Sequence, residues 1–183
     1  MEATMNSVKA VIELLSGPSM QRNFGEELPL IDHLLQTAEL LWTDTGDGEL
    51  AMAGLLHDTS WTRGSSEADH ADDSARIAQE FGFSPRVVEL IALHVTAKRY
   101  LVRADSRYWG KLSKESRATL VEQGGALPIT EVATFEASAH FGDAIRLRLA
   151  DDMAKDPVRR TRPLLEFTPI IEHALSSGAG PAR

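Results

Sequence analysis

The chain contains no cysteine among its 183 residues. This excludes disulfides, zinc fingers and iron–sulfur clusters, and it removes thiolate chemistry from the possible activities. Long apolar runs are also missing near the N-terminus, because Glu2, Lys9 and Glu13 interrupt the first 20 residues. We therefore expect neither a signal peptide nor a membrane span. Both absences are compatible with a soluble protein in a reducing cytoplasm.

Positive charge is in short supply. The 19 Lys and Arg residues against 27 Asp and Glu residues give a formal net charge of −8. Such an acidic balance argues against a nucleic-acid or anionic-membrane surface. A small anionic substrate remains compatible if basic side chains gather inside the site, because salt screens the overall field over roughly 10 Å.

The residues that are present favour helices. At 183 residues and 43% hydrophobic content, the chain is long enough for one compact domain, which we expect over residues 1–175, with a flexible tail at 176–183. Apolar residues recur with helical spacing almost throughout, and no convincing alternating stretch occurs. The predicted class is therefore an all-α helical bundle. The expected helices cover residues 8–15, 31–42, 49–56, 70–81, 85–100, 114–123, 130–151 and 163–175.

Imidazole and carboxylate side chains occur in an order that suits a two-metal site. His57 and Asp58 follow an apolar helix directly, and adjacent helical residues point about 100° apart. The histidine can thus bind one ion while the carboxylate spans two. Six protein ligands are too many for one catalytic ion that keeps positions open for substrate, so two ions sharing a carboxylate are predicted. The predicted ligands are His33, His57, Asp58, His70, His94 and Asp151.

Each of these residues alone has an ordinary explanation. A single buried histidine is more often a hydrogen-bonded core residue than a ligand, and Asp151 beside Asp152 could be a solvated helix end. Four of the six histidines, however, fall in separate predicted helical segments, and jointly they favour a metal site. The remaining two, His140 and His173, fit no ligand position and are assigned to the surroundings of the site or to the surface.

This pattern resembles the HD-domain superfamily, whose one-metal core of His, His-Asp and a distant Asp matches His33, His57-Asp58 and Asp151. His70 and His94 resemble the extra ligands of its dinuclear branch. Local strings are similar, more narrowly, to the oxygenases of that superfamily that cleave organophosphonates. These strings lie at 24–26, 33–38, 94–101, 112–116, 123–125 and 151–155. myo-Inositol oxygenase is a more distant relative of the same kind.

The resemblance implies a buried mixed-valent centre of two iron ions, Fe(II) and Fe(III), with dioxygen as co-substrate. It further implies oxidative cleavage of the carbon–phosphorus bond of a small organophosphonate. The expected substrate is a 1-hydroxy-2-(trimethyl)aminoethylphosphonate, or its unmethylated amine, which would give glycine betaine or glycine together with phosphate.

Basic side chains are placed to meet the phosphonate. Lys98 lies one turn after His94, and Arg148 lies three residues before Asp151, so each shares a helix face with a predicted ligand. The planar guanidinium of Arg148 suits phosphonate oxygens. The ordinary alternative is that both residues are surface charges.

Three further positions complete the expected substrate site. Ser116 and Thr119 share a face of the helix at 114–123 and could donate hydroxyl groups to the phosphonate. Glu26 resembles a family glutamate that meets the substrate amine. The alternative for each is an ordinary solvated polar residue.

Two positions depart from the enzymes that act on aminohydroxyethylphosphonate. Trp61 stands where they have a histidine that assists substrate binding, and Asn23 stands where they have a tyrosine. A larger aromatic surface favours a bulkier or quaternary-ammonium head group, because indole faces attract such cations. Alternatively, Trp61 simply packs beneath the neighbouring helix.

Two other function classes use the same residues. A metal-dependent phosphohydrolase acting on a nucleotide or phosphate monoester would employ the same ligands with a bridging hydroxide and would be indifferent to oxygen. A catalytically inactive HD module that binds a ligand or partner is disfavoured, because all six candidate ligands are present. The spacing leaves open the metal bound, the methylation state of the substrate and the oligomeric state.

Overall fold

The chain folds into helices joined by short connections, and the predicted all-α class is confirmed. A computed structural model describes residues 2–178, and this part of the chain contains no strand. The α-helices are α1 Glu2–Leu15, α2 Leu30–Thr45, α3 Gly48–Leu56, α4 His70–Phe81, α5 Pro85–Ala104, α6 Tyr108–Lys111, α7 Lys114–Glu122, α8 Ile129–Glu136, α9 Phe141–Met153 and α10 Thr168–Gly178. The 3-10 helices are η1 Pro18–Gln21, η2 Thr59–Arg63 and η3 Leu164–Phe167.

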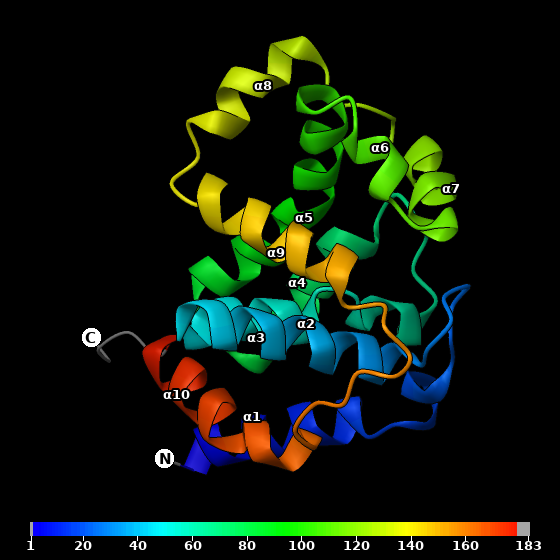
Figure 1. Ribbon diagram of the computed structural model, residues 1–183. Coiled ribbons are helices and arrows are strands. Elements are labelled where there is room, and N and C mark those ends of the chain that lie inside the picture. Colours follow the sequence, from blue (N-terminus) through cyan, green and yellow to red (C-terminus); the bar gives the residue numbers. More distant parts are fainter. Residues whose placement is uncertain (1, 179–183) are drawn as a thin grey trace.

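Helix α3 is the centre of the bundle. It is apolar on all sides, and a helix of that composition is stable only when neighbours cover it completely. Eight of its nine residues are buried, and it packs against α2, α5, α9 and α10. In Figure 1, α2 and α3 cross the middle of the molecule together. The buried C-terminal end of α3 delivers His57 and Asp58 to the interior.

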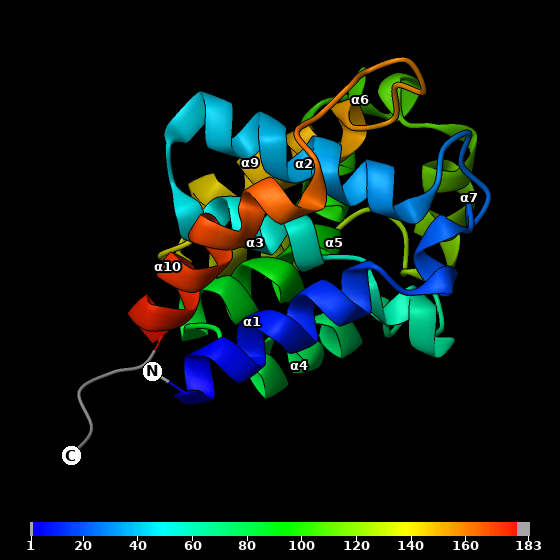
Figure 2. The same ribbon diagram turned by 90° about the horizontal axis from the view of Figure 1, so that it is seen from below.

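The other helices form two groups around this centre. Figure 1 shows α5 and α9 on one side of α2 and α3, with α1 and α10 on the other. The view from below in Figure 2 shows α1 beside α10 and close to α4, in agreement with their contacts. Helix α4 packs along α5. This arrangement brings one end of α2, α3, α4 and α9 and the middle of α5 toward a common interior region.

No helix between residues 2 and 178 combines the length and the apolar character that crossing a membrane requires.

Helix α5 begins as its sequence predicts. The hydroxyl of Ser84 accepts a hydrogen bond from the backbone N–H of Val87 at 3.3 Å, and Pro85 occupies the first helical position. The helix continues to Ala104, four residues beyond the predicted end. Its start is therefore determined locally, and its register carries both His94 and Lys98 into the interior.

The prediction of one long helix over residues 130–151 is wrong. The chain turns between α8 and α9, where the hydroxyl of Ser138 accepts a hydrogen bond from the backbone N–H of His140 at 3.1 Å. The turn allows Phe135, Phe141 and Tyr100 to pack edge to face, with ring centroids 5.1–5.4 Å apart. Packing between distant segments thus overrides a continuous helical pattern.

Smaller differences occur at the ends of other elements. The segment predicted as a helix at 163–175 starts as η3 and continues as α10 to Gly178, three residues into the predicted tail. Residues 179–183 of that tail lie outside the described residues. The one-turn helix α6 was not predicted, because four residues are too few to show a periodic pattern.

Candidate metal centre and substrate pocket

The four predicted histidine ligands are all held in the same way. Each donates its Nδ1–H to a backbone carbonyl oxygen 2.7–2.9 Å away. A carbonyl can only accept, so the proton resides on Nδ1 and the lone pair resides on Nε2. For His33, His57, His70 and His94 the acceptors are the carbonyls of Ala154, Gly54, Glu67 and Ile91, respectively.

The free nitrogens meet in two pairs. Nε2 of His33 lies 3.2 Å from Nε2 of His57, and Nε2 of His70 lies 3.2 Å from Nε2 of His94. Two neutral imidazoles paired in this way cannot form a hydrogen bond with each other, because neither Nε2 carries a hydrogen. Each buried pair is therefore satisfied by a cation beside its nitrogens, either a proton or a metal ion.

Asp58 lies between the two pairs. Its Oδ2 is 3.6 Å from Nε2 of His57, while its Oδ1 is 3.6 Å from Nε2 of His70 and 3.7 Å from Nε2 of His94. Within residues 2–178, Oδ1 is buried and has no hydrogen-bond partner. The two oxygens of the carboxylate thus face the two pairs of histidines, and its role as a bridge between two ions remains a prediction.

Asp151 completes the first group. Its Oδ1 lies 3.3 Å from Nε2 of His33 and 3.8 Å from Nε2 of His57. The first group thus consists of two histidines and two carboxylates, and the second consists of His70, His94 and the shared Asp58. Three protein donors at the second position would leave coordination positions open on an ion held there. The six predicted ligands are brought together, and their donor set suits two first-row metal ions.

The charges around the centre favour a cation. Burial by itself would lower the pKa of His57, but the carboxylates of Asp58 and Asp151 outweigh it and raise that pKa to about 9. His94 shows the opposite balance, because burial and the neighbouring His57 and His70 lower its pKa to about 3. Burial would raise the pKa of Asp58, yet the surrounding imidazoles hold it well below its usual range. The carboxylates therefore remain ionised beside neutral or cationic partners.

A cavity of about 230 Å³ opens beside both groups of candidate ligands and is lined by His33, Asp58, His70, His94 and Asp151. It brings together all six predicted substrate residues, whose roles toward a substrate remain predictions. The side chains around it include Glu26, Trp61, Lys98, Ser116, Thr119 and Arg148 from the predicted set, together with Asn23, Phe24, Glu67, Glu115, Gln123 and Lys155.

Lys98 is deeply buried in this cavity. Only 3% of its surface is exposed, and its ammonium donates a hydrogen bond to Oγ1 of Thr119 at 3.1 Å. Burial, together with the positive charge of Arg148, lowers the pKa of Lys98 to about 7. A buried cation with one neutral partner has donors left for an anion in the cavity.

Arg148 is already engaged by protein groups. Nη1 contacts Oδ2 of Asp151 at 2.6 Å, Nη2 binds Asp152, and Nε donates to the hydroxyl of Tyr108 at 3.1 Å. Because Oδ1 of Asp151 faces the histidines, the guanidinium orients this ligand from behind. The geometry thus assigns Arg148 a role in holding Asp151. Contact between Arg148 and the substrate remains a prediction.

Glu26 is also paired. Its Oε1 binds the ammonium of Lys155 and accepts a hydrogen bond from the hydroxyl of Ser113 at 3.0 Å. Lys155 donates in addition to the hydroxyl of Ser116 at 3.1 Å. This ion pair neutralises the glutamate that was expected to meet a substrate amine.

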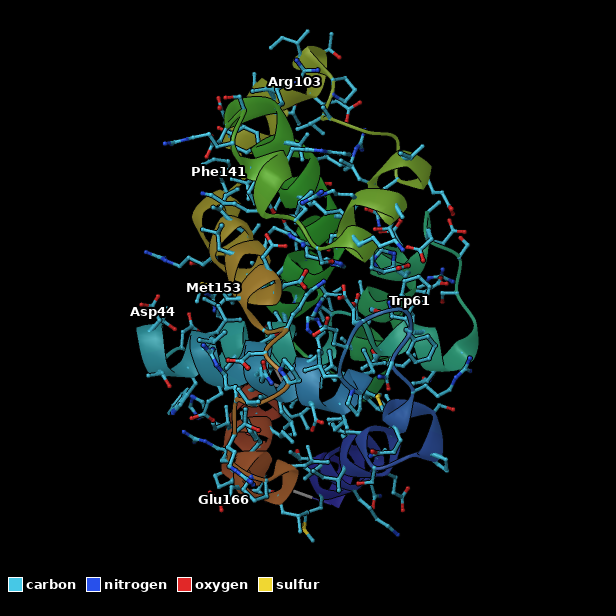
Figure 3. All side chains as sticks on the ribbon, turned by 45° about the vertical axis from the view of Figure 1, so that its right-hand side comes forward. Asp44, Trp61, Arg103, Phe141, Met153 and Glu166 are labelled. Carbon is cyan, nitrogen blue, oxygen red and sulfur yellow. The ribbon has the colours of Figure 1, made fainter. Side chains whose placement is uncertain are left out.

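Trp61 covers a metal ligand. Its ring stacks on the imidazole of His70 with centroids 4.9 Å apart and planes inclined by 18°. The ring centroid of Phe24 lies 6.2 Å from that of Trp61. Figure 3 shows Trp61 beside the loop that precedes α2. Phe24 has a positive φ of 45°, which L residues rarely adopt, and Gly25 follows with φ 88°. Trp61 therefore both packs on the site and lines the cavity.

Several pocket residues were not singled out from the sequence. Glu67 lies three residues before His70, and this spacing was the available signal. Lys155 lies in the irregular segment after α9, where spacing has no predictive value. The same holds for Tyr108 in the short helix α6, which does not line the cavity but binds Arg148. Of the two unassigned histidines, His140 lies 3.7 Å from Glu89 near the surface and His173 is exposed, as expected.

Comparison with known proteins agrees with this geometry. The HD domain family matches residues 30–123. The (1-hydroxy-2-(trimethylamino)ethyl)phosphonate dioxygenase (glycine-betaine-forming) of Leisingera caerulea is 25% identical over 93% of this chain and 93% of its own length. The hydroxymethylphosphonate dioxygenase of Gimesia maris is 31% identical over 92% of this chain and 88% of its own length. The predicted family resemblance is confirmed.

Proposed function

Because the chain belongs to the HD-domain family, we propose that it uses dioxygen to oxidise a 1-hydroxyphosphonate and to break its carbon–phosphorus bond. The observation that carries this proposal is the two-part ligand cluster bridged by Asp58, which opens into a cavity containing buried basic side chains. The two relatives named as phosphonate dioxygenases support the reaction class. We also propose the cytoplasm as its location.

The proposed substrate is 1-hydroxy-2-(trimethylamino)ethylphosphonate or its unmethylated amine, with glycine betaine or glycine and phosphate as products. The first of these substrates is the one named for the Leisingera caerulea relative. The reaction balances as one hydroxyphosphonate dianion and one dioxygen giving one carboxylate, one hydrogen phosphate and one proton. Carbon 1 loses its hydrogen and its phosphorus, and each product gains one oxygen atom.

The proposed metal ions are two irons, one held by His33, His57, Asp58 and Asp151 and the other by His70, His94 and Asp58. When bound, they supply the electron transfer to and from dioxygen and a Lewis-acid site for the substrate. The chain's own contribution is to position the substrate and to keep water away from it. The carbonyl hydrogen bonds fix each imidazole, and Arg148 fixes Asp151.

Lys98 is the proposed phosphonate-binding cation. Its ammonium is buried, it lies one turn after His94, and Thr119 holds it from the side. Ser116 offers a hydroxyl beside Lys155 on the same cavity wall. Together these groups present donors to the three oxygens of a phosphonate in a site of low dielectric constant, where such contacts are strong.

Oxygen dependence tests the proposal. The protein is expressed with iron, its metal content is determined, and phosphate release is measured from 1-hydroxy-2-(trimethylamino)ethylphosphonate, from its amine and from hydroxymethylphosphonate, with and without dioxygen. We expect about two irons per chain and phosphate release only with dioxygen. Release from ordinary phosphate esters without dioxygen, and none from any phosphonate, would instead assign the protein to the phosphohydrolases.

A further inference from the structure

We propose that Glu67 determines specificity by accepting the cationic head group of the substrate. This inference rests on the proposed function and names the residue that contacts the ammonium group of the substrate. It differs from the expectation that the family resemblance raised for Glu26. The carboxylates that line the cavity differ in whether a protein cation already compensates their charge.

Glu26 is compensated within the protein. Its carboxylate is bound by Lys155 and by the hydroxyl of Ser113, so a substrate ammonium would have to displace a lysine to reach it. The side chains of this pair are only 16% and 22% exposed, which limits the screening of their attraction by water. The cavity therefore offers little net negative charge at Glu26.

Glu67 is not compensated in this way. It lines the cavity, and its Oε2 is buried without a hydrogen-bond partner among the described residues. A buried carboxylate oxygen without a partner is costly, and a cationic ligand removes that cost.

The backbone holds Glu67 in place. Its carbonyl oxygen accepts the Nδ1–H of His70 at 2.8 Å and lies 3.5 Å from Nε2 of Gln123. This contact ties the residue to His70 of the second group of candidate ligands, which also faces Oδ1 of Asp58. Lys98, the proposed phosphonate-binding cation, follows His94 of the same group by one turn, so a cation and a carboxylate for a zwitterionic substrate line one cavity.

The neighbours of Glu67 suit a quaternary ammonium. Trp61 stacks on the same His70 whose Nδ1 is bound by the Glu67 carbonyl, and Phe24 lies against Trp61. Glu115, a second cavity carboxylate, contributes to the charge around Glu67 and approaches the backbone at Gly25. Aromatic faces and carboxylates together favour a diffuse cation over a neutral group.

The test compares two substrates in one variant. Glu67→Gln keeps the shape of the side chain and the backbone carbonyl that holds His70. We expect its kcat/KM for 1-hydroxy-2-(trimethylamino)ethylphosphonate to fall roughly 10- to 100-fold, the range for a lost contact to a charged group. Hydroxymethylphosphonate has no cation, and its kcat/KM should change by no more than about twofold.

A matched control removes an exposed charge that does not line the cavity. Glu131→Gln should leave the ratio of the two kcat/KM values unchanged. Iron content and binding of 2-(trimethylamino)ethylphosphonate by calorimetry are measured for each variant, so that a folding or metal defect is recognised. The binding should weaken in Glu67→Gln and remain in Glu131→Gln.

The failures of the two proposals are distinguishable. Equal losses for both substrates in Glu67→Gln, or a wild-type enzyme that prefers hydroxymethylphosphonate, would overturn the role of Glu67 while leaving oxidative cleavage in place. Absence of dioxygen-dependent phosphate release from every phosphonate would overturn the proposed function itself.

Discussion

Asp58 faces both groups of metal ligands with different oxygens of one carboxylate. Its removal leaves the second group with only His70 and His94, which are too few ligands to hold an ion firmly. The first group keeps His33, His57 and Asp151. The two positions therefore depend on Asp58 to different degrees.

We expect Asp58→Ala to bind at most about one iron per chain and to lose phosphonate cleavage, against about two irons in the unmodified protein. His70→Ala should lose the second ion alone, because it does not touch the first group. Metal analysis after dialysis measures both. Two tightly held irons in Asp58→Ala would contradict a bridging carboxylate.

Lys98 supplies a second prediction at this scale. Burial and Arg148 lower its pKa to about 7, so its ammonium is present below that pH and is lost as the pH rises above it. We expect the KM for the phosphonate to rise between about pH 7 and 9, because the neutral amine no longer attracts a dianion. Steady-state kinetics across this range measures the effect.

Lys98→Arg is the control for this pH dependence. A guanidinium stays charged throughout the range, so the rise of KM above pH 7 should disappear even if KM itself is higher. A KM that rises equally in both proteins would assign the titration to another group.

At the scale of elements, the contact between α2 and α3 sets the distance between ligands on the two helices. A Cβ added at Gly54 would lie 2.7 Å from Cδ1 of Leu41, 3.1 Å from Cγ2 of Thr37 and 3.3 Å from the backbone nitrogen of Ala38. The carbonyl of Gly54 also holds the ring of His57. Gly54 thus has two roles: its lack of a side chain lets α2 and α3 pack closely, and its carbonyl orients the ring of His57.

We expect Gly54→Ala to lower the free energy of unfolding by about 1–3 kcal/mol, as overpacking of a core does. It should also reduce the iron content, since α3 must move away from α2. Gly142→Ala is the control, because nothing lies within 4 Å of an added Cβ there. Its stability should be unchanged or higher by up to about 1 kcal/mol. Denaturant unfolding measures both, and equal effects would contradict the packing argument.

At the scale of the whole molecule, the metal centre joins distant parts of the chain. Its ligands come from α2, the end of α3, α4, α5 and α9, which together span most of the bundle. The unfolded chain cannot present these six side chains at once. Metal binding must therefore stabilise the folded state as a whole.

We expect iron loading to raise the Tm by roughly 5–10 °C, since a ligand at about 100 times its Kd contributes about 2.7 kcal/mol. Chelation should reverse the rise, as measured by calorimetry under anaerobic conditions. Asp58→Ala is the control, and its Tm should respond much less to iron. A Tm independent of metal would contradict a site built from five helices.

Much of the fold was predictable from local pattern. The spacing of apolar residues located most of the helices, and the Ser84-Pro85 signal located the start of α5. The break between α8 and α9 was not predictable, because it depends on Tyr100, which lies more than 30 residues before the turn. The spacing of apolar residues indicates which secondary structure a segment favours by itself. Packing against distant residues decides whether the segment adopts that structure in the folded protein.

The sequence by itself determined the helical class and the identity and order of the six candidate ligands, because helical periodicity and ligand chemistry are properties of the residues themselves. Only the tertiary structure decided which charges remain available in the cavity. Lys155 neutralises Glu26 across 129 residues of sequence, and Glu67 keeps an oxygen without a protein partner in the described part of the chain. Such pairings depend on how distant segments pack, and no local pattern carries that information.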